Sequence, residues 1–351
     1  MIQIFPNYPW HPSDQPSVLK KEDKKLLRKD SASDFIKLLL TNLVFYPYLF
    51  IKFLFKNKKS TNTKVDTSFY GLCVNLDKGE EQVALVEELG VKSLQIRFYL
   101  SDMENLDAYV AFAKSFGEDK DIVINIIQDR KHIEQEKLLH KDIRIVFDRF
   151  SSVTNRFIIG NAINRIKWGF VSIEEYLEFY EKVQNVRDEY YPHIQLIGSS
   201  VIDFEYHFTI RTLFNHSNIH YDGLASLLYV DRRGAPSNTQ YGLFDLKNKI
   251  EFLDTIVKTS NRCENKIIIS ETNWPLKDTA PYAPTSELEC VSHEEYTKYM
   301  IEYFDIASKT NKIETIYWHQ LIAPGYGLVD NRDGKLVKLP QFEAFKKMIQ
   351  G

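Results

Sequence analysis

Short apolar runs alternate with amphipathic segments from residue 69 to the last helix of the chain. Eight runs have the length and the β-branched or aromatic content of buried strands. They are residues 69–76, 93–100, 121–129, 156–162, 194–203, 223–230, 266–272 and 314–321. The pattern predicts eight strands, each followed by a helical segment.

The segments between these strands have helical periodicity. Examples are GEEQVALVEELG, ENLDAYVAFAKSFG, SIEEYLEFYEKVQNVRDEYY, DLKNKIEFLDTIVKTS and HEEYTKYMIEYFDIASKT, and PQFEAFKKMIQ can form the last helix. Eight strand–helix units in residues 69–351 fit the size of a (β/α)8, or TIM, barrel. A doubly wound sheet is the alternative, but no G-x-G-x-x-G follows the first strand and the chain has no P-loop.

Residues 1–68 differ from the rest of the chain in their pattern of apolar and polar positions, and we interpret them as an N-terminal extension. Residues 1–17 are rich in proline and aromatics without a regular period, which predicts irregular structure. A basic stretch at 20–29 precedes an apolar segment at 35–55 that contains Pro47. A cleavable signal peptide is not expected, because the apolar run starts far from residue 1 and lacks a small-residue site.

A helical projection of residues 35–55 separates two faces. Lys37, Thr41, Asn42, Lys52 and Lys56 share one arc, and Phe35, Leu39, Leu43, Tyr46, Phe50, Phe53 and Leu54 lie opposite. A basic face against an apolar face favours a helix that lies on an anionic membrane, with residues 20–59 in contact with it. A membrane span and a helix packed on the protein remain alternatives.

Composition narrows the function classes. The apolar fraction of 44% and the charged fraction of 26% are those of a globular protein, and the net charge of −3 argues against a nucleic-acid partner. The three cysteines have no metal or redox spacing, which fits a reducing compartment. The nine histidines show no metal-ligand spacing either. We therefore expect neither a metal nor a cofactor.

Candidate chemistry gathers where the predicted strands end, which is the catalytic face of a (β/α)8 barrel. The candidates, in chain order, are Arg97, Asn161, Asn164, Arg165, Asp203, Glu205, Tyr229, Asp231, Arg232, Arg233, Glu271, Trp274, Trp318 and His319. Any one of them could serve the fold instead, for example in an internal salt bridge.

The stretch IIISETNWP (267–275) resembles the nucleophile strand of clan A retaining glycoside hydrolases. These are (β/α)8 enzymes with one glutamate on the fourth strand and another on the seventh. The resemblance implies that Glu271 is the nucleophile, that Asn161 binds a sugar hydroxyl, and that Trp318 lies under the sugar. GYGLVD (325–330) is similar to the closing segment of such barrels.

The fourth strand departs from this pattern at the residue after Asn161. The resemblance implies an acid/base glutamate there, but the residue is Ala162, in RFIIGNAINRIKWG (156–169). Retaining hydrolysis needs a nucleophile and a proton donor. Glu205 is the provisional donor, followed by Asp203 and Asp231. Alternatively the substrate needs little acid help, the barrel binds glycans without cleaving them, or Ala162 is an engineered substitution.

Arginines at the strand ends bear on the substrate. Arg97, Arg165 and the adjacent Arg232 and Arg233 can form a planar fork for a carboxylate or a phosphate. An anionic sugar is therefore expected: a uronic acid, a 3-deoxy-ulosonic acid or a phosphorylated sugar.

Three functions follow from these features. The first is a glycosidase for an envelope glycan or glycolipid, peripheral on the cytoplasmic face of a bacterial inner membrane. The second is a non-catalytic glycan-binding or scaffold protein within an envelope polysaccharide or lipopolysaccharide assembly complex, and the third is a transglycosidase.

Overall fold

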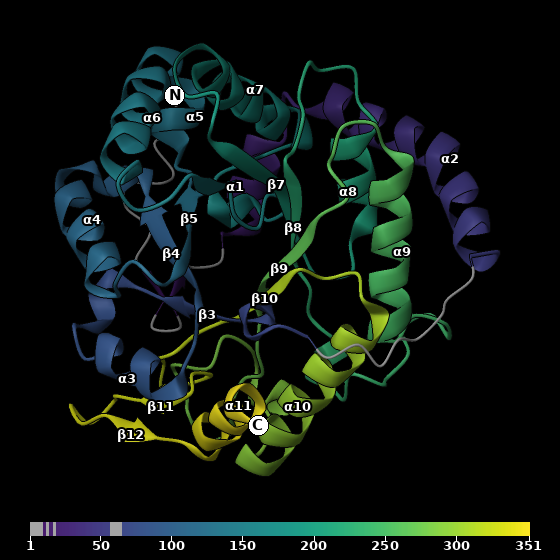
Figure 1. The fold of residues 1–351 in the computed structure, drawn as a ribbon. Helices are drawn as coiled ribbons and strands as arrows, with labels where there is room; N and C mark the ends of the chain where they lie inside the picture. The colour runs from purple at the N-terminus through teal and green to yellow at the C-terminus, as the bar shows by residue number, and fades with distance from the viewer. Residues whose placement is uncertain (1–9, 12–13, 17–18, 57–64) are drawn as a thin grey trace.

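Eight parallel strands close into a barrel in the order in which they follow one another along the chain (Figure 1). The computed structural model describes residues 10–11, 14–16, 19–56 and 65–351, without the side chains of residues 10, 11 and 232. The strands are β3 (Tyr70–Val74), β4 (Ser93–Tyr99), β5 (Asp121–Ile127), β6 (Arg156–Ile159), β7 (Gln195–Ile202), β8 (Gly223–Leu227), β9 (Ile267–Thr272) and β10 (Thr315–Trp318). β10 pairs with β3 and closes the ring. The predicted (β/α)8 barrel is confirmed, and the doubly wound alternative is wrong.

Helices surround the barrel and connect its strands. They are α3 (Gln82–Leu89), α4 (Leu106–Ser115), α5 (Arg130–Glu134), α6 (Glu136–Phe150), α7 (Ile173–Tyr190), α8 (Tyr206–Leu213), α9 (Leu246–Thr259), α10 (His293–Thr310) and α11 (Pro340–Gln350). A small ladder pairs β11 (Val329–Asp330) with β12 (Val337–Lys338). A capping box at Ser292 and Glu295 starts α10, as two reciprocal side-chain–backbone bonds fix its first turn.

The barrel has an inner and an outer core. Seven of the strands contribute one layer of the inner core: Cys73, Val123, Ile158, Ile197, Ala225, Ile268 and Tyr317. The outer core fills the space between the strands and the helices, and includes Leu94, Ile96 and Phe98 of β4. Because side chains alternate along a strand, Gln95 and Arg97, which lie between these three residues in the sequence of β4, point into the barrel. Arg97 thus lies one step nearer the C-terminal mouth than the inner layer.

The N-terminal extension folds against the barrel. Its first described elements are β1 (Trp10–His11) and β2 (Gln15–Pro16), which pair antiparallel and precede α1 (Lys21–Leu27). The irregular structure expected for residues 1–17 is therefore wrong for this hairpin, whose strands are two residues each. Residues 1–9, 12–13 and 17 lie outside the described part of the chain, as do 57–59 of the predicted membrane contact.

Helix α2 (Ala32–Leu54) covers the predicted helical segment and packs along α8 and α9 (Figure 1). Its polar residues face the protein. The Lys37 ammonium lies 2.6 Å from the Glu174 carboxylate of α7, and Asn42 Nδ2 donates to the His207 carbonyl at 2.9 Å. Beyond the helix, Lys56 Nζ lies 2.5 Å from Asp254 Oδ2 of α9.

The predicted division of the α2 faces is therefore wrong for the aromatic residues, although Leu39 and Leu43 of the predicted apolar face are exposed. The aromatic rings assigned to the membrane pack on the barrel: Phe53 is fully buried, and Tyr46 and Phe50 contact Phe252 edge-on. The exposed face carries Tyr48 and a set of aliphatic side chains that is named here the α2 stripe: Ile36, Leu39, Leu40, Leu43, Val44 and Ile51, each more than half exposed. By length and composition α2 is also the one described helix that could cross a membrane.

Candidate active site

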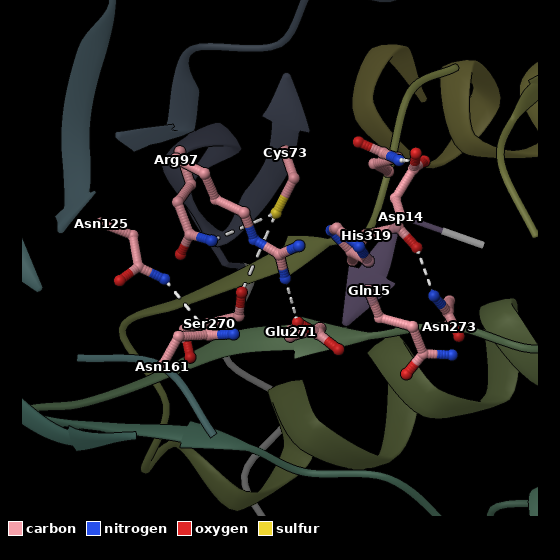
Figure 2. A network of polar contacts seen from close by, with 12 residues as sticks. Asp14, Gln15, Cys73, Arg97, Asn125, Asn161, Ser270, Glu271, Asn273 and His319 are labelled. Atoms are coloured by element: carbon pink, nitrogen blue, oxygen red, sulfur yellow. Dashed lines mark hydrogen bonds and ion pairs between the residues drawn. The ribbon is translucent and has the colours of Figure 1, made fainter. Parts of the chain in front are cut away.

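A cavity of ≈ 120 Å³ lies at the C-terminal mouth of the barrel, beneath the N-terminal hairpin. Its lining includes these predicted residues: Arg97, Asn161, Arg165, Tyr229, Arg233, Glu271 and His319. Ala162 also lines it. Figure 2 shows Arg97 and His319 directed toward the same space as Glu271. The structure thus brings together side chains of strands β4 and β9 and of the segments that follow β6, β8 and β10.

Glu271 lies in β9 near its C-terminal end and is 8% exposed. One carboxylate oxygen accepts a hydrogen bond from Arg97 Nη2, and the other accepts one from the Tyr229 hydroxyl. Burial disfavours the charged guanidinium of Arg97, but Glu271, together with smaller contributions from Tyr99, Cys73 and Tyr326, raises the Arg97 pKa above its usual value. Burial and Glu271 both raise the pKa of Tyr229, so its hydroxyl keeps its proton. Arg97 and Tyr229, which both keep their protons, therefore fix the orientation of the Glu271 carboxylate at the wall of the cavity.

Asn161 and Ala162 follow β6, and both are buried. Asn161 Oδ1 accepts a hydrogen bond from Asn125 Nδ2 at 3.4 Å, while its own Nδ2 has no protein partner. The Ala162 methyl group belongs to an apolar cluster with Ile127, Leu227 and the ring of Trp168. The place where the resemblance implies an acid is thus lined by carbon atoms.

Glu205 and Asp203 lie beside the cavity in an ion-pair cluster. Arg165 Nη1 is 2.7 Å from Glu205 Oε2, and its Nη2 is 2.7 Å from Asp203 Oδ2. Asn164 Nδ2 donates to the same Glu205 oxygen at 2.7 Å, and Asn164 also bridges to the Ile202 backbone. Only Arg165 of these four lines the cavity. The geometry gives Glu205 and Asp203 the role of holding Arg165, and it does not favour either as proton donor.

Two further predicted residues, Asp231 and Arg233, begin and end a short 3₁₀ turn after β8 (Asp231–Arg233). The Arg233 guanidinium lies over the Tyr229 ring at 3.5 Å, and its Nη1 has no hydrogen-bond partner. Asp231 is not among the residues that line the cavity. The Arg232 side chain lies outside the described part of the structure.

The two tryptophans occupy a different layer from the one expected. Trp318 is fully buried in the outer core, where its Nε1 donates to the Tyr296 hydroxyl of α10 at 2.8 Å. Trp274 stacks on Trp318 with ring centroids 5.8 Å apart. Neither tryptophan lines the cavity. The expected position of Trp318 under a sugar is wrong, because the alternation along β10 sends Tyr317 and His319 inward and Trp318 outward.

His319 lines the cavity and stacks on Tyr326 with ring centroids 5.5 Å apart. Burial, together with the positive charges of Arg97 and Lys78, holds its pKa well below the usual range. The imidazole is therefore neutral at neutral pH, and its Nδ1 has no hydrogen-bond partner. Such a ring can exchange a hydrogen bond with a ligand, but it cannot supply a proton.

Several residues of the site were not predicted from the sequence: Asp14, Gln15, Lys167, Asn273 and Tyr326. Asp14 accepts hydrogen bonds from Lys78, Gln320 and the Tyr326 hydroxyl, which pin the hairpin across the mouth. Lys167 lies in the stretch 156–169 and Tyr326 in the stretch 325–330, and the family resemblance of these two stretches is a signal that could have identified both residues. Asp14 carries no local signal.

Comparisons with known proteins bear on the fold. The sequence matches no family model and no curated protein. A GH39 β-xylosidase from Caulobacter crescentus is similar in structure, with 12% identity, a TM-score of 0.59, and coverage of 83% of this chain and 73% of that one. A GH2 β-galacturonidase from Eisenbergiella tayi bound to galacturonate is also similar, with 12% identity and a TM-score of 0.54. The alignment covers 81% of this chain and 51% of that one.

A third similar structure is a GH128 endo-β-1,3-glucanase from Amycolatopsis mediterranei in complex with laminaritriose and laminaribiose. It has 13% identity and a TM-score of 0.51, and the alignment covers 80% of this chain and 98% of that chain. At these identities the likeness concerns the fold alone. The predicted resemblance to (β/α)8 glycoside hydrolases is thereby confirmed at the level of architecture.

Proposed function

We propose that the protein is a glycosidase in which Glu271 attacks the anomeric carbon of an anionic sugar. The observation that carries the proposal is the carboxylate of Glu271, held between Arg97 and Tyr229 at the cavity. A nucleophile of this kind needs a fixed orientation and donors that do not take its charge away. The glycoside hydrolases among the structural neighbours support the same reaction class.

The charge of the cavity supports an anionic substrate. Four cationic side chains line it, Arg97, Arg165, Lys167 and Arg233, against two carboxylates, Asp14 and Glu271. Buried polar atoms on its lining also lack protein partners: Arg97 Nε, Asn161 Nδ2, Asn273 Oδ1 and His319 Nδ1. Buried polar groups are normally satisfied, so these atoms are candidate contacts for hydroxyl and carboxylate groups of a ligand. We infer a uronic acid, a 3-deoxy-ulosonic acid or a phosphorylated sugar in an envelope glycan or glycolipid.

Covalent trapping tests the nucleophile. Activated fluoro-sugars of the three anionic classes are incubated with the protein, and digested peptides are searched by mass spectrometry for an adduct. We expect the adduct on Glu271 with one class and none with a neutral xylose or glucose reagent, because only an anionic sugar complements the cations. Glu271→Gln serves as the matched control. Absence of any adduct, or full activity of Glu271→Gln, contradicts the proposal.

A non-catalytic glycan-binding partner is the second candidate. The observation that favours it is the apolar surrounding of Ala162, where no carboxyl group faces Glu271 from the fourth strand. Calorimetric binding of an anionic oligosaccharide without any adduct on Glu271 supports this reading. A transglycosidase differs from both, because it forms the adduct and passes the sugar to an added acceptor sugar.

We infer further that the α2 stripe lies on an anionic membrane surface. Its six aliphatic side chains are each more than half exposed, and Lys21, Lys24, Lys25 and Arg28 of the neighbouring basic stretch supply positive charge. Because hydrogen bonds and ion pairs tie α2 to α7, α8 and α9, a helix resting on the membrane fits better than a separate span. The cytoplasmic face of a bacterial inner membrane agrees with three unpaired cysteines.

Liposome flotation tests the membrane contact. We expect the protein to float with anionic vesicles and less with neutral ones, and Leu39→Glu/Leu43→Glu to stay in the load fraction. Leu288→Glu, at a residue that is 98% exposed on another surface, is the matched control and should float like the native protein. Flotation of the stripe variant equal to that of the native protein contradicts the membrane contact. A stable complex with another protein through the α2 stripe would mean that the stripe is a protein interface.

A further inference from the structure

The proposed reaction needs a proton donor opposite Glu271, and this inference rests on that proposed function. We propose that Lys167 is the donor: its ammonium protonates the leaving oxygen, in place of the glutamate of the fourth strand. Lys167 belongs to the 3₁₀ turn Ile166–Trp168, in the loop that follows β6, and lines the same cavity as Glu271.

The loop that carries Lys167 is fixed by the neighbouring strand. Gln128, after β5, donates from Nε2 to the Asn161 carbonyl at 2.9 Å and to the Trp168 carbonyl at 2.8 Å. The Asn161 amide in turn donates to Gln128 Oε1 at 2.9 Å. One amide side chain thus clamps both ends of the loop. A catalytic group needs this kind of support from its surroundings.

The ammonium of Lys167 is exposed to the cavity without a carboxylate partner among the described residues. Its hydrogen bond goes to the neutral Oε1 of Gln15. Burial lowers its pKa to about 8; the negative charge of Glu271 opposes this, and the positive charges of Arg165 and Lys24 add to it. At pH 7 the group is still mostly protonated, yet it is on the order of a hundredfold stronger as an acid than a free lysine.

Other groups at the cavity are poorer donors. His319 is neutral, and the hydroxyls of Tyr229 and Tyr326 have pKa values raised well above their usual range, chiefly by burial. Asp14 lies 2.9 Å from Lys78 Nζ and accepts two further hydrogen bonds, so both of its carboxyl oxygens are already engaged in holding the hairpin. Lys167 remains the acid that the cavity presents.

The two steps of the reaction balance. In the first, a Glu271 oxygen bonds to the anomeric carbon while the glycosidic bond breaks, and the leaving oxygen takes a proton from Lys167, which becomes an amine. In the second, that amine takes a proton from water as the water oxygen bonds to the anomeric carbon. Glu271 departs as a carboxylate, and Lys167 is again an ammonium.

Leaving-group dependence tests the role. Lys167→Arg keeps the positive charge but cannot give up a proton at neutral pH. With a substrate whose leaving group is an alcohol, we expect kcat to fall by about 10²–10⁴-fold. With the corresponding glycosyl fluoride, whose leaving group needs no proton, we expect the rate constant of the first step, measured as the burst of released fluoride, to stay within about threefold of the native protein. The second step is slowed on both substrates because arginine cannot act as its base. Equal losses of the first-step rate constant on both substrates would overturn the proposal.

The pH profile and a spectroscopic titration provide independent readouts. The donor must be protonated, so activity of the native protein on the alcohol-leaving substrate should fall as the pH rises through about 8. Lys167→Arg should lose this limb. In lysine-labelled protein, NMR should show Lys167 titrating near 8, with buried Lys249, whose pKa is also lowered to about 8, as an internal reference in both proteins.

The lysine donor and the glycosidase function can be contradicted by different results. If the fluoro-sugars label Glu271 in both proteins but Lys167→Arg cleaves the alcohol-leaving substrate at the native rate, only the lysine donor is wrong. If no sugar labels Glu271 in the native protein, the glycosidase function is wrong and the donor falls with it. An ordinary lysine pKa at Lys167 also overturns the donor.

Discussion

Arg97 and Glu271 form a buried ion pair, and removal of either partner is expected to lower the stability of the fold. Both side chains are nearly enclosed, so neither charge can recover its hydration when the partner is removed. We expect Arg97→Met to lower the free energy of unfolding by about 3–5 kcal/mol. Arg97→Met/Glu271→Gln should regain much of this loss, because no unpaired charge remains buried. Urea unfolding of the two variants measures both values, and equal stability of the two would contradict the pairing.

Single residues of the site differ in how far the sequence predicts them. Glu271 could be found because its motif places it at the end of a strand. Trp318 could not, because a strand end alone does not say which side chains point inward. The alternation of Ile316 and Trp318 with Tyr317 and His319 decides that, and it becomes clear only when one inward residue is known. Lys167 was missed because a lysine becomes an acid only through its surroundings.

At the scale of elements, the N-terminal hairpin forms part of the wall of the cavity. Asp14 and Gln15 line a space of ≈ 120 Å³, well below the roughly 300–1,000 Å³ of most small-molecule sites. We expect Asp14→Asn to loosen the hairpin, because it removes the charge that pairs with Lys78, and to speed labelling of Glu271 by the fluoro-sugar several-fold. Asp77→Asn removes the other, exposed partner of Lys78 and should leave the rate unchanged. Equal labelling rates in both variants would show that the hairpin does not limit access.

Helix α2 shows what a helical pattern can and cannot predict. Its existence and position followed from a long apolar segment bounded by lysines. The face that packs on the barrel did not, because aliphatic and aromatic side chains both count as apolar in a helical projection. Phe53 and Phe252, with ring centroids 5.3 Å apart, show that the aromatic side fits the grooves of α9. Leu39, Leu40 and Leu43 are left exposed, whereas Leu49 is fully buried.

At the scale of the whole molecule, the order of the elements was the most predictable property. Eight apolar runs separated by amphipathic helices allow few arrangements, and a closed parallel barrel buries every one of them. The path of the N-terminal hairpin was beyond prediction. Its contact between Asp14 and Gln320 joins residues that are 306 positions apart, and it depends on two polar side chains without a local pattern.

The proposed membrane contact of the α2 stripe would place the proposed active site beside a lipid-linked substrate. A surface-bound enzyme meets a lipid-linked sugar at a raised effective concentration, whereas a water-soluble substrate gains nothing from the surface. We expect Leu39→Glu/Leu43→Glu to lower the initial rate on a vesicle-bound glycolipid by about tenfold or more. Its rate on the soluble glycosyl fluoride should match the native protein, since neither leucine touches the cavity. Leu288→Glu controls for added surface charge. A loss on both substrates would place the defect in the barrel, and no loss on either would mean that the α2 stripe has no part in reaching the substrate.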